Sequence, residues 1–453
     1  MRLPSQAASA TGQAPTTAAP PADSGLAGLW TQDTLLGDLG GLRPALARAG
    51  LTFGLQETDE VLGNLTGGIH RGAAYDGLTQ MSLQLDTQKA FGWAGGTFNV
   101  SALQIHGRNL SADNLGVLQS ASGIEAERAT RLWELWYQQS FLGGQADVKI
   151  GQQSIDNEFM VSQHALLFVN TVMGWPALPG ADLYAGGPAY PLSSLGVRLR
   201  VHPTGALTIL AGVFDDNPPG GPFANDPQSL DASGTAFGLR TGALFIAEAQ
   251  YAINQAKDSS GLPGTYKLGF WYDTASFPDQ RFDNTGLSLA DPASTGVPVT
   301  HRPNYSFYMV ADQMVWRAGP HSPRAVGAFV RAMGTPDDRN MISFSVNAGL
   351  TLTDPLPGRD SDTFGIGFGL ARFSSRAAAL DRDVGFFSGS PYPVRGSETF
   401  LEVTYQAQLT PWWQLQPDFQ YFFAPGGGIE NPDAPGQRIG NEAVFGLRSI
   451  IVF

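Results

Sequence analysis

Charged side chains alternate with apolar ones in several short runs of this 453-residue chain. Residues 195–202 place Val197 and Leu199 on one side and Arg198 and Arg200 on the other. A period of two predicts a β-strand, because successive side chains of a strand point to opposite faces. Carboxylate and guanidinium groups in such rows can form charge-assisted hydrogen bonds with a solute. The pattern therefore indicates binding of a polar solute along one face of a strand.

The same parity selects further charged residues. An Arg or Lys that faces lipid at the midplane of a membrane barrel costs roughly 2–4 kcal/mol, so in such a barrel these charges should face inward. Two interpretations stay open: the charges pair with one another and brace the wall, or a subset protrudes at a constriction and binds solute. Trp136 and Trp271 share this parity and either stack on an apolar face of the solute or belong to the wall. The candidate channel residues are Glu134, Trp136, Lys149, Asp156, Glu158, Arg198, Arg200, Glu248, Lys267, Trp271, Asp312, Asp418 and Arg448.

The elements that would position these residues are strands nearly throughout. Residues 400–423 contain two alternating runs around the break Leu409–Pro411, and their polar face is rich in Gln, Thr and carboxylates. A soluble sheet usually carries many Lys and Glu residues there. About sixteen such runs follow one another between Leu51–Thr58 and Glu442–Phe453. We expect an all-β fold, a transmembrane antiparallel barrel of about sixteen strands with apolar side chains toward lipid and polar ones toward a wet lumen.

The connections between the predicted strands are unequal. Short turns such as Pro203–Gly205 alternate with long loops rich in Gly, Pro, Asp and Asn, which is typical of outer-membrane barrels. The loop 154–194 carries Asp156 and Glu158 before a short apolar stretch, and we expect it to fold into the channel; an extracellular cap is the alternative. Aromatic residues near strand ends are expected to form interfacial girdles. They include Trp133, Tyr137, Trp175, Tyr251, Tyr272, Tyr305, Trp316, Trp412, Trp413, Tyr421 and Phe453.

Composition restricts the class of protein. Charged residues make up 15% of the chain, no run is long enough for a membrane-spanning helix, and the net charge of −13 argues against a nucleic-acid ligand. The absence of cysteine excludes disulfides and thiolate metal sites, and it suits passage through an oxidising periplasm. Residues 1–27 are rich in Ala, Pro and Thr without a signal-like apolar core. We expect them to be a disordered arm near a processed end, followed by a helical segment at 28–50 and the barrel at 51–453.

Enzyme motifs are missing from the sequence. It contains no P-loop, no HExxH and no G-x-S-x-G motif, and its six histidines have no metal-ligand spacing. Gly365–Gly369 has the glycine alternation of a nucleotide loop but lies within a strand pattern and lacks a following helix. We therefore predict no catalytic residues, no metal and no cofactor.

The ordered set of short stretches resembles the carbohydrate-selective outer-membrane porins of the OprB family. The matching stretches are 35–43, 85–89, 95–98, 134–139, 149–159, 190–199, 311–313, 416–421 and 446–453. The resemblance implies a sixteen-stranded barrel that admits sugars by diffusion, a short periplasmic N-terminal helix and a C-terminal Phe453 that acts as the barrel-assembly signal. It also implies the outer membrane of a Gram-negative bacterium as the location.

Several functions remain in competition at this point. The first is a porin for mono- and small oligosaccharides, in which low-affinity sites in series favour both binding and release. A general or organic-acid channel is the second, and an outer-membrane enzyme the third; a soluble β-propeller that binds a ligand is a fourth. The expected partners are sugars, outer-membrane lipid and lipopolysaccharide, and the barrel-assembly machinery through the last strand, with the chain a monomer or a homotrimer. The transported sugar is left open.

Overall fold

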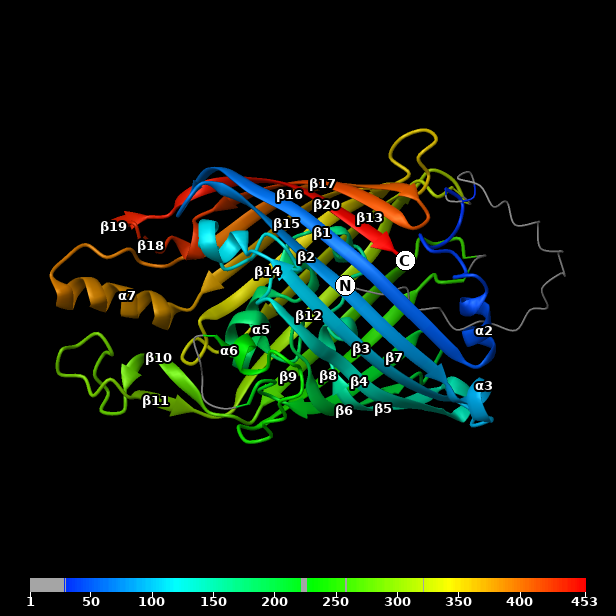
Figure 1. Cartoon of the computed structure of the whole chain (residues 1–453). Coiled ribbons are helices and arrows are strands. Elements are labelled where there is room, and N and C mark those ends of the chain that lie inside the picture. Colours follow the sequence, from blue (N-terminus) through cyan, green and yellow to red (C-terminus); the bar gives the residue numbers. More distant parts are fainter. Residues whose placement is uncertain (1–27, 29, 221–225, 257–258, 321) are drawn as a thin grey trace.

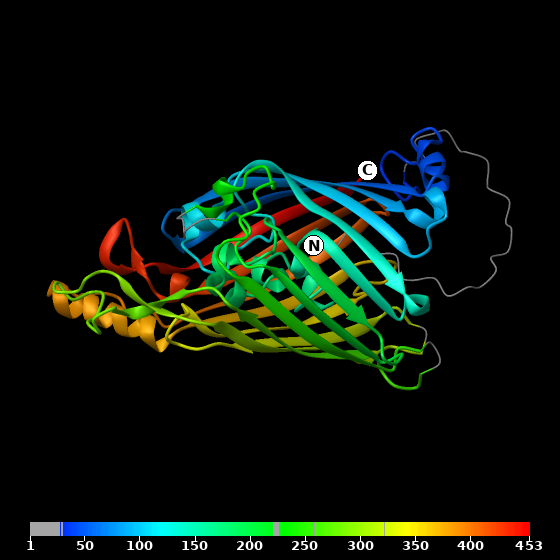
Figure 2. The same cartoon turned by 90° about the horizontal axis from the view of Figure 1, so that it is seen from below.

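Strands of the chain close into one antiparallel barrel (Figures 1 and 2). This computed structural model describes residues 28, 30–220, 226–256, 259–320 and 322–453, so the arm predicted at 1–27 lies outside the described residues. The barrel strands, in order, are β1 (Leu51–Gly68), β2 (Gly72–Asp86), β3 (Gly96–Gly107), β4 (Ala129–Phe141), β5 (Ala146–Gln153), β6 (Ser194–Val201), β7 (Leu207–Asp215), β8 (Ala243–Ile253), β9 (Gly264–Asp273), β12 (Asn304–Arg317), β13 (Ala325–Gly334), β14 (Ile342–Thr353), β15 (Thr363–Phe373), β16 (Ser397–Thr410), β17 (Trp413–Phe423) and β20 (Gly440–Val452). The prediction of a sixteen-stranded barrel is confirmed.

Smaller elements occupy the connections. The helices are α2 (Leu42–Arg48), α3 (Thr87–Phe91), α4 (Thr171–Gly174), α5 (Ala177–Asp182), α6 (Pro227–Leu230) and α7 (Ser375–Ser388). Single helical turns lie at η1 (Ser111–Leu115), η2 (Leu142–Gly144), η3 (Ile155–Asn157), η4 (Ala165–Leu167), η5 (Tyr184–Gly186) and η6 (Pro425–Gly427), and two outer hairpins pair β10 (Phe277–Asp283) with β11 (Pro298–His301) and β18 (Glu430–Asn431) with β19 (Ala434–Arg438). None of the described helices has the length and apolar character needed to cross a bilayer.

The first and last strands close the barrel, with Val61 of β1 opposite Leu447 of β20. The segment before β1 is tied to this seam. The backbone amide of Leu35 donates to the Val452 carbonyl at 2.8 Å, and the Arg43 guanidinium contacts the backbone oxygen of Phe453. The short helix predicted before the barrel is therefore present as α2, anchored at the point where the strand order closes.

Side chains alternate along the strands as the sequence predicts. On β16, Leu401 and Val403 are exposed on the outer wall, whereas Glu402 between them is fully buried on the lumen side. The polar face thus points inward and the apolar face outward, the reverse of a soluble protein. Hydrogen bonds between neighbouring strands around the closed ring satisfy the backbone groups that lipid could not.

The two ends of the barrel differ. Short connections and the helices α2 and α3 lie at one end, whereas α7 and the hairpins β10–β11 and β18–β19 project from the other (Figure 1). The opening hairpin departs from prediction, because β1 continues to Gly68, well beyond the predicted limit at Thr58, and β2 begins at Gly72. The missed part has polar residues on both faces, so its alternation of apolar and polar side chains is weak.

Candidate functional site

The connection between β5 and β6 lies inside the barrel. This inward segment, residues 154–193, includes η3, η4, α4, α5 and η5. Its buried side chains Phe159 and Met173 belong to one apolar cluster with lumen-facing wall residues such as Phe214 and Phe329. Because those wall side chains point toward the barrel axis, the segment fills part of the lumen.

Wall carboxylates accept hydrogen bonds from the backbone of the inward segment. Glu248 on β8 accepts from the Met160 amide at 2.8 Å. Asp312 on β12 accepts from the Gln163 amide at 3.0 Å. Glu402 on β16 accepts from the Val169 amide at 2.5 Å. Three strands on different sides of the lumen therefore hold one stretch of the segment by charge-assisted hydrogen bonds.

Wall cations bind the carbonyl groups of the same stretch. Arg331 on β13, 1% exposed, donates to the carbonyl oxygens of Met160, Val172, Met173 and Gly174 at 2.5–3.1 Å. Lys267 on β9 donates from Nζ to the Val161 carbonyl at 2.7 Å. The buried guanidinium thus caps backbone groups that would otherwise lie unpaired away from water.

Glycines on β15 make room for the inward segment. A Cβ atom on Gly365 would stand 2.6 Å from Leu167, and one on Gly367 would stand 2.8 Å from both Phe168 and Met173. Separations below 3.0 Å require a neighbour to move, so side chains at these positions would displace the segment. Gly365 and Gly367 therefore leave space on the wall for apolar side chains of the segment, whereas Gly369 leaves space for Phe400 of the neighbouring strand β16.

A cluster of ion pairs joins the start of the segment to the wall. Glu158 from the segment contacts Lys149 of β5 and lies 2.6 Å from Nε of Arg198 on β6. Asp147 on β5 contacts Arg198 and accepts from Nε of Arg200 at 2.7 Å. We call these five residues the Glu158 cluster. Lys149 Nζ also lies 5.0 Å from the centre of the Trp136 ring, within cation–π range.

Glu158 belongs to the inward segment and not to a membrane-spanning strand. The neighbouring cations of the Glu158 cluster keep its carboxyl group ionised. Burial by itself would raise the pKa of this carboxyl group. Lys149 and Arg198 outweigh burial and lower the pKa to about 2. Glu158 is therefore a carboxylate at every physiological pH.

Several cavities adjoin the inward segment. One of about 370 Å³ meets it only at Leu166. Of two others, the larger, about 270 Å³, is lined by Glu158 and Gln163 of the segment and by Arg200, Lys267 and Asp312 of the wall. The smaller, about 80 Å³, is lined by Asp156, Trp175 and Tyr190 of the segment and by Arg448 of β20. The larger has several charged donors and acceptors around one space, whereas the smaller combines charges with aromatic rings.

The other charged residues that the sequence predicted for the channel form hydrogen bonds or ion pairs within the protein. Glu134 accepts from the Ser154 amide at 3.1 Å, and Asp156 accepts from the Tyr190 amide at 3.1 Å. Arg448 pairs with Glu60 across the closing seam, and Asp418 accepts from the Gln420 side chain at 2.9 Å. These groups lie on the lumen side, yet most of their polar atoms are bound to protein.

Two aromatic residues differ from their predicted positions, and Trp271 takes the buried wall position that was one of its two alternatives. Trp271 is 0% exposed within the apolar cluster, so neither face of its ring is open to a solute. Trp133 packs with the lumen-facing residues Leu78 and Leu103, and Trp175 lies in the inward segment with Nε1 donating to the Gly186 carbonyl at 2.8 Å. The predicted girdle positions of Trp133 and Trp175 are therefore wrong, because nearness to a strand end does not fix the face.

Sequence reasoning missed some groups of the site. Asp147 shares the parity of Lys149 and could have been selected by it, but Glu60 lies beyond the predicted end of its strand. In the described part of the chain, one set of side chains could hold a metal ion, namely Glu57, Asp59 and His106. They are on β1 and β3, too far apart in sequence for a spacing motif. They lie on the outer wall and take no part in the lumen.

A barrel closed on itself, with a polar lumen and an apolar outer wall, is the architecture of a porin. The family model of the carbohydrate-selective porins, OprB family, matches residues 70–453. The chain belongs to the OprB family of carbohydrate-selective porins. It is thus an outer-membrane channel of the Gram-negative type and not an enzyme, and the expected family, function class and location are confirmed.

Individual relatives agree with this assignment. Porin B of Pseudomonas aeruginosa is 26% identical over 444 residues, covering 92% of this chain and 91% of that protein. The putative porin QuiX of Acinetobacter baylyi is 26% identical over 432 residues, covering 89% and 92%. The high-pH structure of Pseudomonas putida OprB superimposes with a TM-score of 0.82 at 25% identity, covering 93% of this chain and 99% of that one.

Proposed function

We propose that mono- and small oligosaccharides diffuse through the lumen beside the inward segment, and that the Glu158 cluster forms the constriction. The observation that carries this proposal is the cavity of about 270 Å³ at which Glu158 faces Arg200 and Lys267. Fixed carboxylates and cations around one small space can replace the water molecules bound to sugar hydroxyls. A few hydrogen bonds formed in competition with water would keep binding weak enough for release.

The predicted residues divide by role under this proposal. Glu158 and Arg200 border the cavity and contact the sugar, whereas the buried Lys149 and Arg198 hold the Glu158 carboxylate in place. Trp136 lies beside Lys149. Glu248, Lys267 and Asp312 position the inward segment, and the last two also border the cavity. A fully buried Trp271 has no part in binding.

The smaller cavity forms a second contact for the same solute. Asp156 and Arg448 supply hydrogen-bonding groups there, and Trp175 and Tyr190 supply aromatic surface. Rings suit the apolar face of a pyranose. Two weak sites on the two sides of the segment favour passage without tight binding.

The charge distribution favours a neutral or cationic solute over an anion. Carboxylates dominate the lumen side of β16, β17, β20, β1 and β2, where Glu398, Glu402, Asp418, Glu442, Glu60 and Asp76 are buried and Arg448 is the cation. A general or organic-acid channel is therefore the second candidate. It is separated from a sugar channel by the experiment below.

The test measures sugar flux into liposomes with Arg200→Ala. The Arg200 side chain is 36% exposed and borders the cavity, so its loss should leave the barrel folded. A hydrogen bond to a charged group contributes roughly 1.5–3 kcal/mol, so sugar affinity should fall about ten-fold and subsaturating flux should fall with it. Arg324→Ala is the matched control, because Arg324 is also 36% exposed and pairs with Asp354 in a turn. Equal sugar flux in both variants, or faster uptake of organic acids than of sugars, would refute the assignment.

Cellular contacts are also part of the proposal. The long loops face the outside of the cell, and α2 within 28–50 faces the periplasm. Phe453 closes the last strand and serves as the signal for the barrel-assembly machinery. Outer-membrane lipid and lipopolysaccharide surround the apolar wall.

A further inference from the structure

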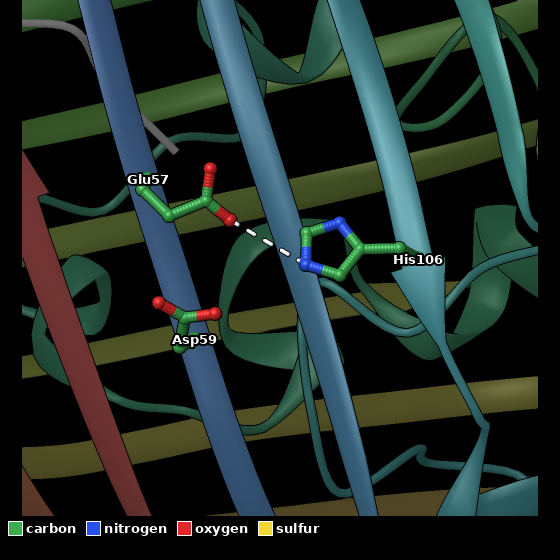
Figure 3. A group of neighbouring side chains, drawn as sticks. All are labelled: Glu57, Asp59 and His106. Atoms are coloured by element: carbon green, nitrogen blue, oxygen red, sulfur yellow. Dashed lines mark ion pairs between the residues drawn. The ribbon is translucent and has the colours of Figure 1, made fainter.

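Two carboxylates and an imidazole lie together on the outer wall of the barrel. Glu57 and Asp59 on β1 flank Thr58, which is buried on the lumen side, so both carboxylates point outward. His106 on β3 extends across β2 toward them (Figure 3). Acyl chains offer no hydrogen bonds, so charged groups in this position require a partner from the protein or a bound ion.

The three side chains converge on one small space. One carboxylate oxygen from each acid and one ring nitrogen of His106 lie within 4.8 Å of one another. Oε1 of Glu57 and Nε2 of His106 are 3.6 Å apart. Two ligands of a tetrahedral Zn²⁺ ion, each bound at about 2.0–2.2 Å, are separated by roughly 3.4 Å. The two atoms therefore stand close to the separation of two ligands on one ion.

The second ring nitrogen of His106 prepares the first to bind a cation. Nδ1 lies 2.8 Å from the side-chain oxygen of Gln104, which can only accept a hydrogen bond. Nδ1 therefore carries the proton, and in the neutral imidazole Nε2 presents a lone pair toward Glu57. A hydrogen bond from the other ring nitrogen to such an oxygen is the usual support of a metal-bound histidine.

The surrounding network has more acceptors than donors. Tyr75 on β2 donates to Asp59 at 2.6 Å, and the Thr79 hydroxyl donates to Glu57. The Tyr75 hydroxyl also lies 3.0 Å from Nε2 of His106, but its single proton is used by Asp59. Oε1 of Glu57 is shielded from solvent and has no hydrogen-bond partner among the described residues. A cation between this oxygen and Nε2 would satisfy both lone pairs.

A glycine on the middle strand lets the imidazole reach across. Gly77 on β2 stands between Asp59 and His106 in the strand register. A Cβ atom on Gly77 would lie 2.2 Å from Nε2 of His106, so a side chain there would push the ring away from the carboxylates. The absence of a side chain at residue 77 thus brings β1 and β3 within reach of one ion.

We propose that Glu57, Asp59 and His106 bind a divalent cation of the Zn²⁺ type on the outer wall. Imidazole nitrogen and carboxylate oxygen are common zinc ligands, whereas Mg²⁺ and Ca²⁺ take oxygen ligands. The two carboxylates balance the charge of one such ion, so the occupied site presents no net charge to lipid. The Tyr75 hydroxyl oxygen is placed to complete the coordination. The ion links β1 to β3 across β2, and the site stands apart from the sugar site in the lumen.

Zinc binding to the protein in detergent, purified without a polyhistidine tag, tests the proposal. The chain has no cysteine, so no thiolate competes for the ion. Isothermal titration calorimetry at about pH 7.5 should detect one dominant zinc site. His106→Ala should lower its affinity at least about ten-fold. No zinc binding to the unmodified protein, or equal affinity in His106→Ala, would overturn the proposal.

His301→Ala is the matched control. His301 on β11 also lies beside two carboxylates, those of Asp279 and Asp338, at 2.8 and 3.8 Å. Arg339 and Arg376 already supply positive charge to these acids. The dominant zinc affinity should therefore be the same in His301→Ala as in the unmodified protein. Loss of this affinity in His301→Ala would place the zinc ion on the outer hairpin and refute the site on the wall.

Thermal stability gives a second measurement. A ligand that binds only the folded state stabilises it, so Zn²⁺ should raise the melting temperature of the unmodified protein. It should leave His106→Ala and Glu57→Gln unchanged. Heat-modified migration in a gel shows whether each barrel is folded, and Glu57→Gln decides the result if His106→Ala does not fold. An equal rise in the unmodified protein and the folded variants, or an equal rise with Mg²⁺, would contradict a zinc site that uses these ligands.

Discussion

Gly367 on β15 and Phe168 of the inward segment approach so closely that a Cβ atom on the glycine would lie 2.8 Å from the phenylalanine ring. Gly367 therefore leaves space on the wall, and the Phe168 ring of the inward segment fills that space. This contact joins residues 199 positions apart in the sequence. The width of the channel here therefore depends on residue 367 having no side chain.

Replacing Gly367 by Leu should push the inward segment off the wall. The backbone at Gly367 lies outside the left-handed region, so the main effect is steric. Single-channel conductance in a planar bilayer should change by about two-fold or more, or fluctuate between levels, while the barrel remains folded. Gly334→Leu is the control, because a Cβ atom there meets its nearest neighbour at 3.7 Å. A steady, unaltered conductance in Gly367→Leu would show that the inward segment does not pack against the wall at Gly367.

Replacing Arg331 by Met should also weaken the attachment of the inward segment to the wall, here by removing hydrogen bonds. The substitution removes the donor to four carbonyl groups and leaves them buried. Breaking such a buried charged network costs about 3–5 kcal/mol, so the melting temperature in detergent should fall by several degrees. Proteolysis within 154–193 should also become faster. Arg324→Met, in an exposed turn, should change neither property.

Glu158→Gln tests the ion pairs of the constriction through their pH dependence. The pKa of Glu158 is lowered to about 2 by Lys149 and Arg198, which outweigh the opposing effect of burial. A lowered carboxyl pKa contributes stability above the unfolded value near 4.5, and this contribution is lost as the pH falls toward 2. The melting temperature of the unmodified protein should therefore exceed that of Glu158→Gln by a constant amount from pH 7 to pH 5, and the difference should shrink below about pH 4. A difference that grows on acidification would contradict the assigned pairing.

The alternation of side chains made most of the barrel predictable. Val197, Arg198 and Leu199 show why: one strand carries both an apolar outer face and a charged inner face, so its pattern is visible in sequence alone. The hairpin of β1 and β2 extends beyond its predicted limits, because Asp59 on the outer face and Glu60 on the lumen face break the alternation of apolar and polar side chains after Thr58.

The site was less predictable than the strands. Parity places Trp271 toward the lumen but cannot show that the inward segment buries it. Glu248 and Asp312 were selected as channel residues from their charge, yet their hydrogen bonds reach backbone amides far away in sequence. The glycines of 365–369 matched a nucleotide loop only in spacing. The surroundings of all these residues depend on how the inward segment, residues 154–193, folds inside the barrel. The two-residue period of the strands does not specify that fold.

The most direct test of the central claim is the ion current through single reconstituted channels during titration with a panel of mono- and disaccharides. If sugars occupy the cavity beside Glu158 and Arg200, they should block the current reversibly and in a concentration-dependent manner. Arg200→Ala should raise the half-blocking concentration about ten-fold, and Arg324→Ala should leave it unchanged. Current that no sugar reduces, or equal block in Arg200→Ala and the unmodified channel, would contradict the account.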